Sequence, residues 1–64
     1  YRKLSNREVE VLRYVSDGKK NNEISKILGL NEKTISTYKL RLLQKLNVTN
    51  LVDLVNKAKT LEIV

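Results

Sequence analysis

Two short amphipathic segments with a glycine between them decide the architecture of this chain. They lie in residues 21–46, which have the sequence NNEISKILGLNEKTISTYKLRLLQKL. In the first segment, Ile24, Ile27 and Leu28 recur at helical spacing, which predicts a helix with these side chains on its inner face. Gly29 can adopt the left-handed conformation that ends a helix. The first segment is therefore expected to be a short helix that stops at this glycine.

The second segment begins at Asn31, a residue whose side chain can cap a helix. Ile35, Leu42 and Leu46 share one helical stripe, with Tyr38 at its edge. Only residues 29–31 join the two predicted helices, and such a tight, glycine-containing connection is typical of a helix-turn-helix. A generic pair of antiparallel helices can show the same pattern, so this motif alone leaves the function open.

Helix signals also flank this motif on both sides. Ser5 followed by Glu8 is a capping box, and Gly18 can end the resulting helix, which predicts a helix near residues 6–17. After the motif, Asn50 can cap a fourth helix and Asp53 can reach back toward it. We expect the inner stripe of this fourth helix to consist of Leu51, Leu54, Ala58 and Leu61. At the start of the second helix Lys20 cannot accept a hydrogen bond, so Asn21 or water is expected to do so.

Composition narrows the classes of function. The 64 residues include 13 Lys and Arg against 7 Asp and Glu, which gives a net charge of +6, and there is no Cys or His. Such a basic domain usually meets a polyanion or an anionic surface, although lysines also serve solubility alone. Without His or Cys, no nucleophile and base fall together, so we expect neither an enzyme nor a metal site nor a cofactor. No apolar run is long enough to span a membrane.

The residue types on the face of the third helix opposite Ile35 are typical of DNA binding. At 100° per residue, this face carries Lys33, Ser36, Thr37, Leu40 and Gln44. An apolar side chain amid polar neighbours can contact a thymine methyl group, while short hydroxyl side chains reach base edges. The predicted base contacts are therefore Ser36, Thr37 and Leu40, although a single exposed leucine is common on any surface.

Basic and polar residues around this face are the predicted phosphate contacts. Such contacts position a protein on the duplex without selecting its sequence. The predicted set is Lys20, Asn22, Lys33, Thr34, Lys39, Arg41 and Lys45. For any one of these lysines, a simple solvated role is an equally good interpretation, and the cluster carries the prediction. Docking of a protein partner on the same basic face is the main alternative.

Three ordered blocks of the sequence resemble a known family. They are residues 4–12 (LSNREVEVL), Gly18 with residues 21–24 (NNEI), and residues 33–36 (KTIS) followed by 45–48 (KLNV). Together they are similar to the LuxR-type helix-turn-helix, which forms the C-terminal domain of NarL/FixJ-type response regulators. The chain departs from the family pattern at Lys20, Ser36, Tyr38, Lys39 and Leu51, so the target sequences of other branches are not transferable.

The resemblance implies one all-α, four-helix effector domain over residues 1–64. It implies double-stranded DNA binding with the third helix in the major groove, and control of transcription as the output of a two-component response regulator. It also implies an upstream receiver domain phosphorylated on aspartate, RNA polymerase as a partner and a cytoplasmic location. The resemblance further implies a homodimer through the fourth helix, at Val52, Val55 and Lys59. Small apolar side chains away from the core stripe can form such a self-complementary patch, although Val52 and Val55 could instead pack against the C-terminus.

Overall fold

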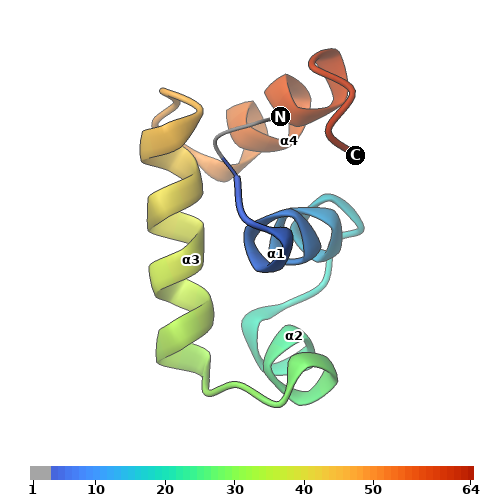
Figure 1. The fold of residues 1–64 in the computed structure, drawn as a ribbon, viewed down its shortest axis with the longest axis vertical. Helices are drawn as coiled ribbons and strands as arrows, with labels where there is room; N and C mark the ends of the chain where they lie inside the picture. The colour runs from blue at the N-terminus through green and yellow to red at the C-terminus, as the bar shows by residue number, and fades with distance from the viewer. Residues whose placement is uncertain (1–3) are drawn as a thin grey trace.

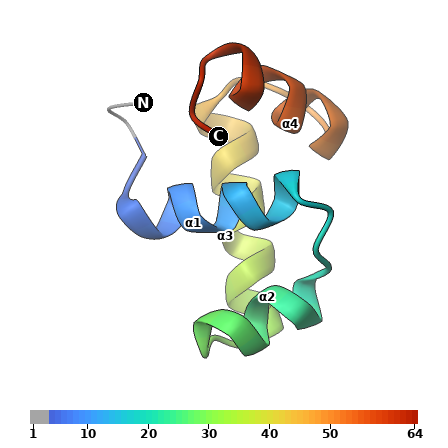
Figure 2. The ribbon, with the colours of Figure 1, turned by 90° about the vertical axis from the view of Figure 1, so that its right-hand side faces the viewer.

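The computed structural model describes residues 4–64. Within that span it contains α1 (Asn6–Ser16), α2 (Asn21–Leu28), α3 (Glu32–Lys45) and α4 (Leu51–Thr60). The long α3 stands along one flank, α1 crosses it near the middle, and α2 and α4 lie toward its two ends (Figures 1 and 2). The predicted all-α fold with four helices is confirmed, and the first three residues of the predicted 1–64 domain lie outside the described part.

The predicted starts of three helices are confirmed by side-chain caps. At α1, the amide of Glu8 donates to Ser5 Oγ (3.2 Å) and the amide of Ser5 donates to Glu8 Oε1 (2.9 Å), which completes the capping box. Asn31 Oδ1 accepts from the amide of Thr34 at α3, and Asn50 Oδ1 from the amide of Asp53 at α4, both at 2.8 Å. The end of α1 falls at Ser16, one residue before the predicted end.

The start of α2 differs from the prediction. No side chain caps the helix at Lys20, and the amide of Glu23 donates instead to Asn22 Oδ1 (2.9 Å), so the predicted acceptor Asn21 is not used there. Glu23 also reaches back, because its Oε1 accepts from the amide of Lys20 at 2.9 Å. The side chain of Asn21 is thereby left available for contacts with another helix.

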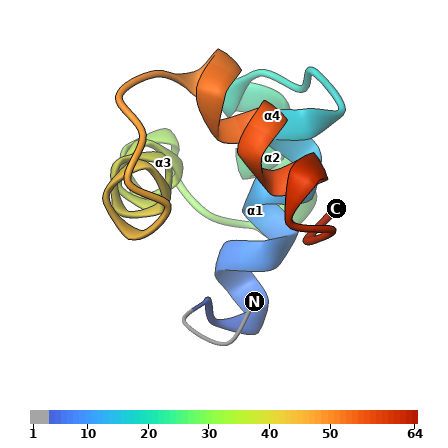
Figure 3. The ribbon, with the colours of Figure 1, turned by 90° about the horizontal axis from the view of Figure 1, so that it is seen from above.

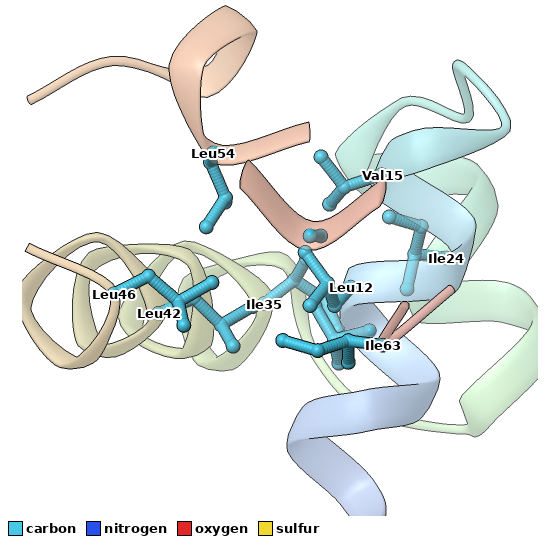
Figure 4. Close-up of a cluster of buried hydrophobic side chains, with 10 residues drawn as sticks. Leu12, Val15, Ile24, Ile35, Leu42, Leu46, Leu54 and Ile63 are labelled. Carbon is cyan, nitrogen blue, oxygen red and sulfur yellow. The ribbon is translucent and has the colours of Figure 1, made fainter. Parts of the chain in front are cut away.

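One hydrophobic cluster, with members from every helix, forms the core between α3 and the other helices (Figure 4). Burying a side chain such as Leu or Ile contributes about 1.5–3 kcal/mol, so this small cluster must supply most of the stability. The predicted stripe of α3 is confirmed, because Ile35, Leu42 and Leu46 are buried while Tyr38 packs at the edge. The buried members are Val11, Leu12, Val15, Ile24, Ile35, Leu42, Leu46, Leu54, Ala58 and Ile63.

Three leucine and isoleucine residues predicted to face inward are instead exposed. Leu51 is 40% exposed, Leu61 44% and Ile27 49%. On α4, the neighbouring helices α1 and α3 cover only the narrower strip of Leu54 and Ala58. Beyond α4 the chain turns back, so Ile63 takes the buried place expected for Leu61. The predicted stripes of α2 and α4 were therefore too wide.

Candidate nucleic-acid interface

One side of α3 is left uncovered by the rest of the fold. Seen from above, α3 stands end-on beside the other three helices, so the side turned away from them is open (Figure 3). Lys33, Ser36, Thr37 and Gln44 are exposed on α3, and Leu40 among them is 61% exposed. The predicted division of α3 into a buried and an exposed side is confirmed, and it leaves a large apolar side chain among polar and basic ones.

The two hydroxyl groups on this exposed side have opposite hydrogen-bonding roles within the domain. Thr37 Oγ1 donates to the carbonyl of Lys33 (3.0 Å), one turn earlier in the same helix. Ser36 Oγ instead accepts from Asn21 Nδ2 at 2.9 Å, across to the first residue of α2. The hydroxyl proton is therefore used at Thr37 and remains available at Ser36.

Lys39 points toward the start of α2 and away from open solvent. Its ammonium donates to Asn21 Oδ1, and its side chain is half-buried. Removal from water disfavours the charged form, so burial lowers the pKa of Lys39 from its usual value of 10.5. Lys39 also lines a groove with Val15 of α1 and Val52 of α4. Lys39 was predicted to contact a phosphate, and within the domain its ammonium contacts Asn21.

Lys45 joins the end of α3 to the beginning of α1. Its Nζ lies 2.8 Å from Glu8 Oε1, and the Glu8 carboxylate is buried, with a side chain only 5% exposed. The side chain of Lys45 itself is 38% exposed. The structure therefore shows Lys45 in an ion pair with Glu8, and its phosphate contact stays a prediction.

The remaining predicted phosphate contacts lie around the ends of α2 and α3. Lys20, Lys33 and Arg41 are exposed, so their charges face solvent. Thr34 Oγ1 donates to Asn31 Oδ1 (2.9 Å), so its hydroxyl would have to turn to donate to a phosphate oxygen. Asn22 uses its side-chain oxygen at the start of α2, as described above, and retains its amide donors. The roles assigned to these residues stay predictions.

The predicted dimer residues of α4 divide between two hollows. Val52, which is 70% exposed, and the half-buried Val55 line the groove that Lys39 also enters. Lys59 is exposed about two helical turns further along and lines a separate hollow with Arg13. The apolar part of the predicted interface is therefore one patch, and Lys59 lies outside it.

Three contacts of this region escaped the sequence analysis. Glu8 and Lys45 are 37 positions apart, and Asn21 is separated from Ser36 and Lys39 by 15 and 18 positions. No local sequence pattern connects residues that are so far apart along the chain. No signal in the sequence indicated the contacts of Asn21, because this residue was itself a candidate acceptor at the start of the second helix.

Residues 4–64 also lack two other kinds of feature. None of their helices is both long and apolar enough to cross a membrane. The same residues contain no group of three or more Asp, Glu, His or Cys side chains placed to hold a metal ion.

The sequence of the chain is similar to those of several known bacterial proteins. The chain is 54% identical over 56 residues to the virulence-factor transcription regulator BvgA of Bordetella pertussis, covering 88% of the chain and 27% of that protein. It is 49% identical over 51 residues to the DNA-binding transcriptional activator EvgA of Escherichia coli, covering 80% of the chain and 25% of that protein. It is 47% identical over 60 residues to the fimbriae Z protein of Salmonella typhimurium, covering 94% and 29%.

The chain thus spans less than a third of each of these relatives. A family model described as "Bacterial regulatory proteins, luxR family" matches residues 2–58, which is most of the chain. This match includes the capping box at Ser5 and Glu8, the whole of α3 and most of α4. The chain belongs to the luxR family of bacterial regulatory proteins.

Proposed function

We propose that this domain binds double-stranded DNA in a sequence-specific way, with α3 in the major groove. The observation that carries the proposal is Leu40, which is 61% exposed in the middle of a face with hydroxyl groups and basic side chains. An apolar contact with a thymine methyl group accounts for a leucine in that place. Ser36 and Thr37 lie on the same exposed side and are the proposed hydrogen-bonding contacts to base edges.

Charge supports the same placement of the duplex. Lys33 and Arg41 are exposed on α3, and Lys20 is exposed at the start of α2, the helix that crosses the DNA backbone in such motifs. We assign phosphate contacts to them, together with Asn22, Thr34, Lys39 and Lys45. Two domains bound to adjacent half-sites would lie about one helical turn, roughly 34 Å, apart.

The name of one relative supports the wider role, because EvgA is a DNA-binding transcriptional activator. We propose that this domain likewise controls transcription, as the output domain of a two-component response regulator. An upstream receiver domain, phosphorylated on aspartate, would then control it, and RNA polymerase would be a partner. Chromosomal DNA as the proposed target supports a cytoplasmic location. The absence of His and Cys from the sequence supports a binding function and no catalysis.

The test is fluorescence anisotropy of the domain with a duplex enriched from a random pool and with an unrelated duplex, over a series of salt concentrations. We expect tighter binding to the enriched duplex, and a steep loss of binding to both as salt rises. Thr37→Ala should weaken binding to the enriched duplex more than to the unrelated one. Lys33→Ala should weaken both alike and reduce the salt slope by about 1.

A matched pair of charge reversals tests which surface of the domain binds DNA. Lys33→Glu should abolish duplex binding, whereas Arg13→Glu makes the same change in charge at an exposed position of α1, beside the end of α4. We expect only a small, salt-sensitive loss for Arg13→Glu, from the lower net charge. Equal effects of the two reversals would contradict the placement of α3 against DNA. Absence of binding to either duplex at low salt would favour a protein partner for the basic face.

A further inference from the structure

Asn21 connects α2 to the exposed side of α3 through both ends of its amide group. Its Nδ2 donates to Ser36 Oγ at 2.9 Å, and its Oδ1 accepts from the ammonium of Lys39. Asn21 is half-buried, and its side chain does not cap α2, since the amide of Glu23 donates to Asn22 Oδ1. The residue therefore has a contact between helices as its only assigned interaction in residues 4–64.

The chemistry of Lys39 determines which way round the Asn21 amide lies. An ammonium group can only donate hydrogen bonds, so the atom of Asn21 that faces it must be the carbonyl oxygen. The nitrogen of the same amide must then face Ser36, where it can only donate. This assignment does not depend on distinguishing nitrogen from oxygen by position alone.

Ser36 thereby uses one of its two lone pairs within the domain and keeps its proton for a donated bond. Ser36 Oγ accepts from Asn21, and its own proton has no acceptor among residues 4–64, so the proton can point outward. Thr37 is in the opposite state, since its proton is donated to the carbonyl of Lys33 and its lone pairs face outward. The two adjacent hydroxyl groups on α3 thus present a donor and an acceptor to whatever binds there.

We infer that Asn21 is a specificity-determining positioning residue, which makes Ser36 a hydrogen-bond donor toward the major groove. Ser36 then favours base edges that carry an acceptor, namely purine N7, guanine O6 or thymine O4, over the donors of cytosine N4 and adenine N6. Asn21 itself need not touch a base. The inference rests on the proposed function, because it presupposes that the exposed side of α3 faces base edges.

Asn21→Asp is the sharpest test, because it keeps the shape of the side chain and replaces its donor by a second acceptor. The carboxylate would still accept from Lys39, and it would now also accept the proton of Ser36. Ser36 would then turn its lone pairs outward, and its preference should move from acceptors toward donors.

The experiment measures binding to the enriched duplex and to every single-base-pair variant of it. Ser36→Ala first identifies the base pair whose preference depends on Ser36, and Thr37→Val identifies the one that depends on Thr37. We expect Asn21→Asp to reduce the preference at the Ser36-dependent pair roughly tenfold or to reverse it. The preference at the Thr37-dependent pair should stay within about twofold. In a Ser36→Ala background, Asn21→Asp should no longer change the preference at the Ser36-dependent base pair.

Two further variants separate polarity from charge and from folding. Asn6→Asp makes the same chemical change at an exposed position of α1, and should leave both preferences unchanged. Lys39→Met removes the donor that orients the Asn21 amide, so it should relax the preference at the Ser36-dependent pair without reversing it. Circular dichroism and thermal unfolding show whether each variant is folded. If Asn21→Asp does not fold, the result for Lys39→Met tests the inference instead.

The outcomes distinguish this inference from the proposed function. If Asn21→Asp weakens binding to all duplexes by one factor, Asn21 has only a structural or electrostatic role and the inference is wrong. If the unchanged domain selects a sequence but Ser36→Ala alters no preference, the inference is wrong while DNA binding by the domain stands. If the unchanged domain binds no duplex, the proposed function fails and the inference fails with it.

Discussion

Glu8 has a buried carboxylate whose environment holds it in the charged form. Its exposed fraction is 3%, and its Oε1 accepts from Lys45 Nζ at 2.8 Å and from the amide of Ser5 at 2.9 Å. Burial raises the pKa of this carboxyl, but the hydrogen bonds from Lys45 and Ser5 and the charge of Lys45 outweigh burial, so the pKa lies below its usual 4.5. The charged form is therefore more favourable in the folded than in the unfolded chain.

The pH dependence of stability follows from the direction of that shift. A carboxyl whose pKa is lowered by folding stabilises the fold above its unfolded pKa of 4.5, and this contribution is lost as the pH falls below that value. Glu8→Gln should cost about 1–2 kcal/mol at pH 7, at the lower end for a charged hydrogen bond because Lys45 is partly exposed. The cost should shrink toward pH 3 in urea unfolding.

The control for this prediction is Glu10→Gln, which removes a charge from an exposed position of the same helix. We expect little change in the free energy of unfolding at either pH, because an exposed surface substitution has a small effect. An equal cost of Glu8→Gln at pH 7 and pH 3 would show that lost packing, and not lost charge, explains the destabilisation.

At the scale of the elements, each helix in residues 4–64 ends in the same way. The chain turns through a left-handed residue with a φ of 82° at Gly18, 67° at Gly29, 57° at Asn47 and 58° at Glu62. Each turn is closed by a backbone bond across five residues, such as that from the amide of Ile63 to the carbonyl of Ala58 at 2.9 Å. This arrangement satisfies carbonyl groups that the helix end leaves open.

Glu62 is the least suitable of these four residues for its position. A left-handed conformation costs an ordinary L-residue roughly 1–2 kcal/mol, whereas glycine adopts it freely and asparagine tolerates it. Glu62→Gly should therefore raise the free energy of unfolding by about 1 kcal/mol, measured from urea midpoints. Glu62→Ala, which removes the charge but keeps a side chain, should give a much smaller change. A lower stability for Glu62→Gly would mean that the turn is not left-handed in solution.

At the scale of the whole molecule, the exposed apolar patch of α4 is available for contact between two domains. Val52 is 70% exposed and lies beside Leu51 and Val55 along one groove. A patch of this size would bury well under the roughly 1,200 Å² that stable interfaces need. We therefore expect a weak homodimer through α4, which DNA or the upstream domain reinforces.

Cooperativity on DNA tests this interface. Val52→Asp should reduce binding to a duplex with two half-sites by about tenfold relative to binding to one half-site, since it places a charge in the apolar contact. Val64→Asp makes the same substitution at a C-terminal position that is 38% exposed, and should leave that ratio unchanged. Sedimentation of the free domain gives the matching measure of self-association. An unchanged ratio and unchanged sedimentation for Val52→Asp would rule out α4 as the interface.

Sequence alone determined the helices, because their limits depend on residues close together in the chain. The acceptors at Ser5, Asn31 and Asn50 bond to amides three residues away, and Gly18 and Gly29 end their helices through their own backbone freedom. The buried stripe of α3 and the exposure of its opposite side also followed from helical periodicity. The family match is consistent with these local features.

Tertiary structure decided which of the apolar and polar side chains meet. The exposure of Leu51 and Leu61 depends on how much of α4 the other helices cover, and periodicity does not state the width of that strip. The pairing of Glu8 with Lys45, and of Asn21 with Ser36, joins residues 37 and 15 positions apart. Such contacts form only when packing of the core brings the helices together. The candidate base-contacting residues are therefore recognisable in the sequence. The direction of the hydrogen bond between Ser36 and Asn21, in contrast, depends on the fold.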